Sequence, residues 1–242
     1  MRILTVEKLY NSFGGLKAIN NLDFYVDEGE IVGIIGPNGS GKTTALNLIT
    51  GFLKPNAGKI TFQGEDITGI TRFQINKKGI ARTFQLCKPF LEFSALQNVM
   101  VGRVYGQEPS HNMETAEVES KEILEMVRLS NKSEVLVKDL TVMERKRLEL
   151  ARALATKPAL LLLDELMAGL NLAEADDACK LITQIRDSKI TIIMVEHIVK
   201  AVTCISNRII VLNMGEKIAE GIPQEIIHHP EVIDVYLGKP HA

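Results

Sequence analysis

Short apolar runs alternate with longer helix-like segments along most of the chain. Runs typical of buried strands lie at residues 30–35, 159–163, 191–195 and 208–212. Strands separated in this way by helices usually run parallel in one sheet, with the helices covering its faces. The pattern therefore predicts an α/β fold with a mainly parallel sheet.

The N-terminal segment follows a different pattern. Residues 4–9 and 22–26 alternate apolar and polar side chains, and Asp27-Glu28-Gly29 supplies turn formers. Such alternation is typical of strands with one exposed face. We expect an antiparallel β subdomain here, beside the parallel core.

Between residues 89 and 139 the apolar spacing becomes helical, and no strand-like run appears. We expect an inserted α-helical subdomain at about residues 89–155, within a single domain that spans residues 1–242. The core lobe would then comprise about residues 1–88 and 156–242. The polar stretch 105–112 is expected to form an exposed loop.

Composition narrows the possible partners and location. The chain has 242 residues, 24% of them charged, and its net charge of −2 gives no general attraction for nucleic acid or an anionic membrane. Its longest apolar run, 159–163, is far shorter than the roughly 18 residues that cross a bilayer. The charged start does not resemble a secretory signal, and the three cysteines are scattered. We expect a cytoplasmic protein with no nucleic-acid partner and no direct membrane insertion.

The strongest chemical motif is the run Gly36-Pro37-Asn38-Gly39-Ser40-Gly41-Lys42-Thr43, which fits GxxxxGK[ST]. It directly follows the strand predicted at 31–35 and opens a helix that continues to Ile49, as a phosphate-binding loop requires. Its amides and Lys42 would bind phosphate oxygens, each contact contributing on the order of 1.5–3 kcal/mol. The alternative is an ordinary glycine-rich turn. The residues of this run expected to bind ATP are Gly36, Pro37, Asn38, Gly39, Ser40, Gly41, Lys42, Thr43 and Thr44.

A second element ends in two adjacent carboxylates, Asp164 and Glu165, directly after the apolar run 159–163. Acids at the end of a buried strand are costly unless they meet a cation. We therefore assign Asp164 and the Thr43 hydroxyl to a Mg²⁺ shell, and Glu165 to activation of an attacking water. The alternative is that both acids are solvated loop residues.

Two further polar residues, His197 and Gln85, are candidates for the same catalytic site. His197 follows the strand predicted at 191–195, where it could contact the γ-phosphate and orient the water. Gln85 precedes the helical segment, where it could bind the metal or the water. Taken singly, each is more often structural, and their order along the chain is what favours a catalytic role.

These motifs, in this order, resemble the ATP-binding-cassette family over the whole chain. The runs 79–85, 195–197 and 230–238 are similar to the G-type ATPase subunit of branched-chain amino-acid importers. The resemblance implies that Phe13 stacks on adenine, with Tyr10 the weaker candidate. It also implies that the helical subdomain, including residues 90–98, docks on permease subunits at the inner face of the cell membrane. The ATPase would act as a dimer, with itself or with a paralogue.

The chain departs from this family at one motif, the signature segment. Family members have a sequence close to Leu-Ser-Gly-Gly-Gln there. Val142 and Met143 replace small residues that allow φ above zero and close approach, and Glu144 brings a negative charge. We expect the helix that follows to span residues 145–155. The resemblance implies that the segment acts on the nucleotide of the other subunit, so we hypothesise a heterodimer with one strong and one weak site. The segment comprises Leu140, Thr141, Val142, Met143 and Glu144.

The expected function is ATP hydrolysis that drives import of branched-chain or related amino acids. One alternative is a cassette ATPase for another cargo, such as a lipid. Another is a non-transport ATP switch, or a nucleotide-binding scaffold, that hydrolyses ATP only weakly.

Overall fold

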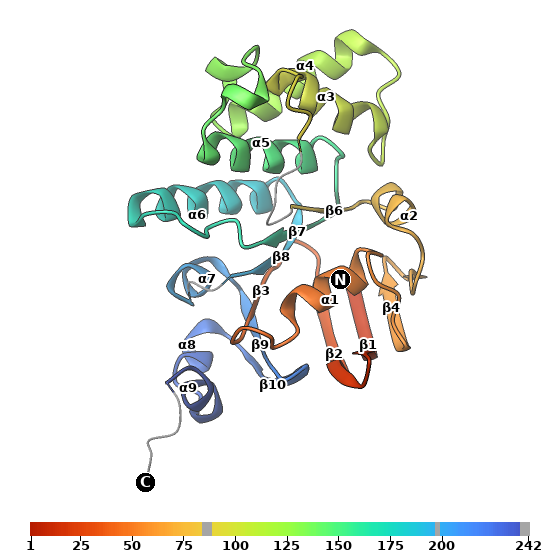
Figure 1. The fold of residues 1–242 in the computed structure, drawn as a ribbon, viewed down its shortest axis with the longest axis vertical. Coiled ribbons are helices and arrows are strands. Elements are labelled where there is room, and N and C mark those ends of the chain that lie inside the picture. The colour runs from red at the N-terminus through yellow and green to blue at the C-terminus, as the bar shows by residue number, and fades with distance from the viewer. Residues whose placement is uncertain (84–88, 197–198, 238–242) are drawn as a thin grey trace. The chain divides into compact units, whose positions relative to one another are not determined.

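The computed structural model describes residues 1–83, 89–196 and 199–237 (Figure 1). Gln85 and His197, two of the expected catalytic residues, lie outside this range. The chain divides into two compact units, Met1–Arg72 with Met167–Ala242, and Phe73–Leu166. Each unit is considered separately below.

The first unit contains an antiparallel sheet with the strand order β2-β1-β4-β5. Strands β1 (Arg2–Phe13) and β2 (Leu16–Asp27) form a long hairpin, with Gly14 and Gly15 at positive φ in its turn (Figure 1). Strands β4 (Ala57–Phe62) and β5 (Glu65–Asp66) extend this sheet. The antiparallel N-terminal layer predicted from alternation is therefore confirmed.

The same unit contains the buried strands β3 (Ile31–Ile35), β8 (Thr191–Val195) and β9 (Arg208–Asn213), in the order β9-β3-β8. They are parallel, and β10 (Glu216–Gly221) pairs antiparallel with β9. This confirms the α/β class and three of the predicted strands. The helices of this unit are α1 (Lys42–Ile49), α6 (Leu172–Asp187), α7 (Val199–Ile205), α8 (Pro223–Ile226) and α9 (Pro230–Leu237).

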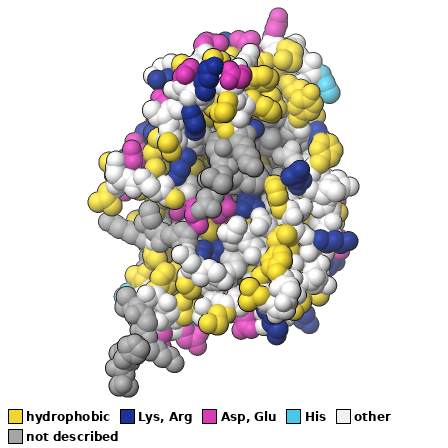
Figure 2. Space-filling view, in the orientation of Figure 1, with side chains coloured by type: hydrophobic (Ala, Val, Ile, Leu, Met, Phe, Trp, Pro, Cys, Tyr) yellow, Lys and Arg dark blue, Asp and Glu magenta, His cyan; other side chains and the backbone are white. Residues whose placement is uncertain are grey.

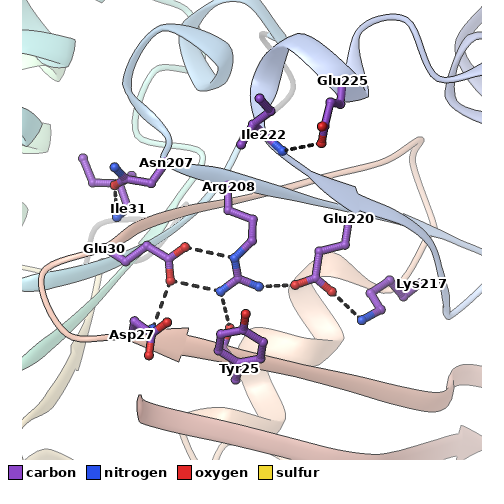
Figure 3. Close-up of polar contacts among 10 residues, drawn as sticks. All are labelled: Tyr25, Asp27, Glu30, Ile31, Asn207, Arg208, Lys217, Glu220, Ile222 and Glu225. Carbon is purple, nitrogen blue, oxygen red and sulfur yellow. Dashed lines mark hydrogen bonds and ion pairs between the residues drawn. The ribbon is translucent and has the colours of Figure 1, made fainter. Parts of the chain in front are cut away.

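A charged cluster around Arg208 ties the antiparallel hairpin to β9 and β10 (Figure 3). Its guanidinium donates to both carboxylate oxygens of Glu30 at 2.9 and 3.0 Å, and also to Glu220. It donates to the Tyr25 carbonyl oxygen at 2.8 Å and lies 4.3 Å from the centre of the Tyr25 ring. The Arg2 guanidinium lies 4.2 Å from the same ring. Arg208 thus joins β2, β9 and β10, and Arg2 adds β1 through the ring of Tyr25.

We expect Arg208→Met to lower the free energy of unfolding by roughly 2–4 kcal/mol, because Glu30 would remain largely buried without the Arg208 cation and Glu220 would keep only its contact with Lys217 among these cations. Urea denaturation followed by circular dichroism measures this. Arg186→Met is the control, because Arg186 pairs with the exposed Asp187 and such pairs contribute about 1 kcal/mol or less. Equal losses in the two variants would contradict the prediction.

The second unit contains the helices α3 (Ala95–Tyr105), α4 (Met113–Met126) and α5 (Val142–Leu154), together with two short 3-10 helices. Helix α2 (Arg72–Lys77) leads to β6 (Ile80–Arg82), which pairs in parallel with β7 (Leu160–Asp164). The predicted helical stretch 89–155 lies inside this unit, and its boundaries as a subdomain stay a prediction. The loop predicted at 105–112 lies between α3 and α4 from Gly106 onward, since Tyr105 still belongs to α3, and it is exposed only in part because Gly106 is buried.

Two surface properties bear on function. No helix in the described parts of the chain is long and apolar enough to span a membrane. Hydrophobic side chains do reach the surface of the helical unit, as the upper part of Figure 2 shows. In the loop before α3, Phe90, Leu91 and Phe93 are 46%, 47% and 43% exposed.

Candidate functional site

The loop between β3 and α1 depends on its glycines. Gly41 has a φ of 104°, and a Cβ atom there would lie 2.6 Å from the Ala18 carbonyl oxygen. A Cβ atom on Gly36 would lie 2.1 Å from the Leu212 carbonyl oxygen. Real Cβ atoms do not approach a carbonyl so closely, so β2 and β9 confine the loop to a path that a side chain would block. The predicted strand, loop and helix to Ile49 are confirmed.

Main-chain contacts far along the sequence hold this loop. The Gly215 amide donates to the Ser40 carbonyl oxygen at 3.0 Å, and the Asn20 amide donates to the Gly215 carbonyl oxygen at 2.8 Å. Met214 and Gly215 both have positive φ in the turn between β9 and β10. Sequence reasoning missed this support, although the pair Met214-Gly215 after an apolar strand is itself a turn signal.

The loop's polar groups fit a phosphate. Lys42 is buried, and its Nζ donates to the carbonyl oxygens of Gly36 and Pro37 at 2.9 and 2.8 Å. The buried Ser40 hydroxyl has no hydrogen-bond partner in the described structure. The first amides of α1 have no acceptor within the helix, and no side chain caps them. An anion at this end of α1 would meet open donors and the positive end of the helix dipole.

The expected adenine-stacking residue lies on the hairpin next to this loop. Phe13 ends β1 and is 48% exposed, whereas Tyr10 is half-buried and pairs with Ala57 of β4. The contact between Gly41 and Ala18 places β2 of that hairpin against the loop. Phe13 is thus the more accessible of the two rings, and its role stays a prediction.

In the second unit, Asp164 lies buried at the end of β7. Arg82 Nη2 donates to Asp164 Oδ2 at 2.8 Å, and the two side chains are 5% and 4% exposed. The Thr83 hydroxyl accepts from the Asp164 amide at 3.2 Å. Asp164 Oδ1 has no hydrogen-bond partner in the described structure. A buried carboxylate oxygen without a donor is a suitable ligand for a cation.

Magnesium would need further ligands, because residues 1–83, 89–196 and 199–237 hold no group of three His, Cys, Asp or Glu side chains placed to bind a metal. Mg²⁺ is usually held by one or two protein oxygens together with water and phosphate oxygens. Thr43, the other described residue expected at the metal, is exposed in the first turn of α1.

The chain turns sharply after Asp164. Glu165 has a φ of 52°, which is uncommon outside glycine. In the first unit, the Met167 amide donates to Oε1 of Glu196 at 2.7 Å, and Glu196 is 1% exposed. Sequence reasoning used Glu196 only for the resemblance. An acid directly after the apolar strand 191–195 was the available signal that its carboxylate has a buried partner.

The signature-like segment differs from expectation. Helix α5 begins at Val142 and not at residue 145, because Thr141 and Glu144 form a capping box. The Glu144 amide donates to Thr141 Oγ1 at 3.2 Å, and the Thr141 amide donates to Glu144 Oε2 at 2.8 Å. Val142 and Met143 lie in the first helical turn, neither with positive φ, so no backbone strain arises from their side chains. The motif Thr-x-x-Glu could have been read from the sequence.

Glu144 keeps its negative charge in this arrangement. The Thr141 amide lowers the pKa of Glu144 by donating to the carboxylate, and Lys132, whose Nζ lies 3.4 Å away, lowers it further. The N-terminus of α5 is therefore already occupied by an ionised carboxylate of its own helix. The Glu144 carboxylate thus offsets the positive end of the α5 dipole, whereas the N-terminus of α1 has no capping side chain.

Comparisons with known proteins agree with these features. Residues 19–168 match the ABC transporter family model, and residues 216–242 match the model of the branched-chain amino acid ATP-binding cassette transporter. The chain is 38% identical to the high-affinity branched-chain amino acid transport ATP-binding protein BraF of Pseudomonas aeruginosa, over 98% of both chains. It is 37% identical to LivG of Escherichia coli, described in the same words, over the same shares.

Solved structures show the same fold. A nucleotide-free ATP-binding cassette from an ABC transporter superposes with a TM-score of 0.89 at 31% identity, covering 99% of this chain and 100% of that one. An ADP conformation of an ATP-binding cassette matches equally well. A dimeric bacterial cassette has a TM-score of 0.83 at 24% identity over 91% of this chain and 99% of that one, which supports the fold alone.

Proposed function

Because this chain belongs to the ATP-binding-cassette transporter family, we propose that it is the ATPase subunit of an importer for branched-chain or related amino acids. Family membership makes the chain a nucleotide-binding ATPase. The observation that carries the narrower proposal is the match of its C-terminal residues 216–242 to the branched-chain model, added to the whole-length similarity to BraF and LivG.

Nucleotide binding follows from the loop before α1. Its amides and the Ser40 hydroxyl face phosphate oxygens, and Lys42 exchanges the carbonyl oxygens of Gly36 and Pro37 for them. Phe13 stacks on the adenine ring. Since Lys42 is already desolvated and bonded within its own loop, it enters the bound state with little further loss of side-chain freedom.

The hydrolytic step requires residues from four segments: the start of α1 and the residues at the ends of β6, β7 and β8. Thr43, Gln85 and Asp164 would hold Mg²⁺, which when bound would neutralise charge on the phosphates. Glu165 accepts the proton of the attacking water, and His197 orients that water toward the γ-phosphate. Lys42 stabilises the negative charge that develops on the transferred phosphoryl oxygens.

In the proposed dimer, the segment least suited to bind a phosphate lies at the N-terminus of α5, residues 140–144. In a closed dimer this segment faces the nucleotide held by the other subunit. Its ionised Glu144 carboxylate is fixed on the helix end, where it opposes an approaching phosphate. A paralogous subunit with an uncharged segment completes the site of this chain better than a second copy does. The assembly is therefore a heterodimer with one strong and one weak site.

We expect this chain alone to release phosphate at least about tenfold more slowly than an equimolar mixture with its paralogue, because one transition-state donor set is lost. Steady-state phosphate release measures both. Glu144→Gln is the informative variant, since glutamine preserves the capping box while removing the charge, and it should raise the activity of the chain alone. Brisk hydrolysis by the chain alone, equal to the mixture and unaffected by Glu144→Gln, would contradict the heterodimer.

Permease subunits are the proposed partners, and the exposed side chains of Phe90, Leu91 and Phe93 are the proposed docking surface. The Phe90 and Phe93 ring centres lie 5.3 Å apart. Asn98, fully buried, holds this loop by accepting from the Phe90 amide and donating to the Phe90 and Ser94 carbonyl oxygens at 2.9, 3.0 and 3.0 Å. These bonds tie the backbone of the loop to α3 while its rings stay exposed, which suits a surface that transmits movement.

We expect Phe93→Asp to reduce co-purification of this chain with its permease at least about tenfold, because an apolar anchor at the centre of an interface typically contributes about 2 kcal/mol. Met113→Asp is the control, since Met113 is 58% exposed at the start of α4 and outside the proposed surface. Recovery of Phe93→Asp equal to wild type would exclude this surface.

The importer itself is tested by reconstituting the chain, its paralogue and the permease in vesicles and measuring ATP-dependent leucine uptake. Uptake that requires this chain and ATP supports the proposal. Movement of a lipid without leucine uptake would support the other cargo class. An absence of any co-purifying polytopic membrane protein would support a non-transport switch.

A further inference from the structure

The ion pair between Arg82 and Asp164 lies where the two parallel strands β6 and β7 end. Arg82 is in register with Leu162, two residues before Asp164. Because side chains two residues apart share a face of a strand, Arg82, Leu162 and Asp164 project from the same face of the pair. The strand register therefore brings the guanidinium to the carboxylate, and both belong to the same compact unit.

The contact is one-sided. Arg82 Nη2 donates to Asp164 Oδ2 at 2.8 Å, whereas the buried Asp164 Oδ1 has no hydrogen-bond partner in the described residues. A bidentate pair, the common arrangement of arginine with a carboxylate, would have occupied both oxygens. The Thr83 hydroxyl also fixes the Asp164 amide. The aspartate is thus held by one oxygen and by its backbone, and its second oxygen is open.

We propose that Arg82 is a positioning residue of the metal site, which holds Asp164 through Oδ2 and reserves Oδ1 for Mg²⁺. This inference rests on the proposed function. Arg82 serves as the resident cation that makes a buried, ionised Asp164 tolerable when no metal is present. Its positive charge also opposes the incoming Mg²⁺, so the pair sets a moderate metal affinity and favours release after each cycle.

The hydrogen bond of Arg82 raises the affinity for Mg²⁺ by positioning Asp164, whereas its positive charge lowers that affinity. Two substitutions separate these effects. Arg82→Gln keeps a donor for Oδ2 and removes the charge. Arg82→Lys keeps the charge and loses the planar geometry. A purely structural ion pair would make both variants less stable without changing their metal dependence.

The test is a Mg²⁺ titration of a fluorescent ADP analogue bound to the full chain, with the protein-bound signal as readout. We expect Arg82→Gln to lower the Mg²⁺ midpoint by about tenfold, because a unit charge near a metal ligand is removed. Arg82→Lys should stay within about threefold of wild type. A folded Arg82→Gln protein whose midpoint is unchanged or raised would overturn the proposal.

Stability supplies a second readout if Arg82→Gln folds poorly. Asp164→Asn removes the buried charge, so the double variant Arg82→Gln/Asp164→Asn should have a urea midpoint closer to wild type than Arg82→Gln has. Additive losses in the double variant would overturn the proposal. If the metal and nucleotide site assigned under the proposed function is wrong, the wild-type chain will show no Mg²⁺-dependent ADP signal. If only this inference is wrong, wild type and Arg82→Gln will titrate alike.

Discussion

Replacing Glu165 with glutamine is expected to lower phosphate release at least about a hundredfold while leaving nucleotide affinity within about threefold of wild type. A general base contributes about 10²–10⁴ to the rate, and glutamine cannot accept the proton of the attacking water. Glutamine preserves the shape of the side chain and can adopt the same backbone, where Glu165 has a φ of 52°. Binding should persist because the loop at residues 36–43 is untouched.

Single-turnover phosphate release and equilibrium ADP binding separate the two effects. Glu122→Gln, on the exposed surface of α4 in the same unit, is the matched control and should leave both unchanged. Turnover by Glu165→Gln equal to wild type would remove Glu165 from the catalytic role, whatever its effect on binding.

Gly41→Val is expected to weaken binding of Mg·ADP by at least about a hundredfold. A branched side chain at a φ of 104° is strained, and its Cβ would overlap the Ala18 carbonyl oxygen 2.6 Å away. Either the loop or β2 must move, and the start of α1 with its open amides would move with it. Several charge-assisted contacts to the phosphates would then be lost together.

Calorimetric titration of Mg·ADP measures this loss, and circular dichroism shows whether the fold persists. Gly64→Ala separates backbone strain from overlap, since Gly64 has a φ of 80° and nothing lies within 4 Å of its Cβ position. That control should lose about 1 kcal/mol of stability and keep its affinity for ADP. Full ADP affinity in Gly41→Val would show that the loop path does not depend on this glycine.

The strands and helices that the sequence predicted are those whose own residues show the pattern of a strand or a helix. Strand β8 has five buried residues, four of them apolar, and its predicted and observed bounds coincide. Strand β6 is three residues long, and β10 carries charged residues with only Ile218 and Ala219 as apolar positions. Such strands are defined by the neighbours with which they pair, and pairing partners are not visible in the segment itself.

The same distinction applies to the candidate site. The phosphate loop was predicted because strand, loop and helix all lie within the single stretch 31–49. The ion pair of Arg82 with Asp164 joins residues 82 positions apart, and no local pattern indicated it. The predicted start of α5, residue 145, was wrong for another reason. Thr141 and Glu144 form a capping box that the sequence Thr-x-x-Glu indicates, but the prediction did not use this motif.

The turn between β9 and β10 has a consequence for synthesis of the chain. The phosphate loop is translated within the first fifth of the protein, yet the Gly215 amide that holds Ser40 is made near the end. Strand β3, from which the loop emerges, pairs with β8 and β9, which are also translated late. A nascent chain on the ribosome therefore carries this loop without its supports until residue 215 has left the exit tunnel. Premature termination before that point yields a product that has the motif but not the conformation that binds phosphate.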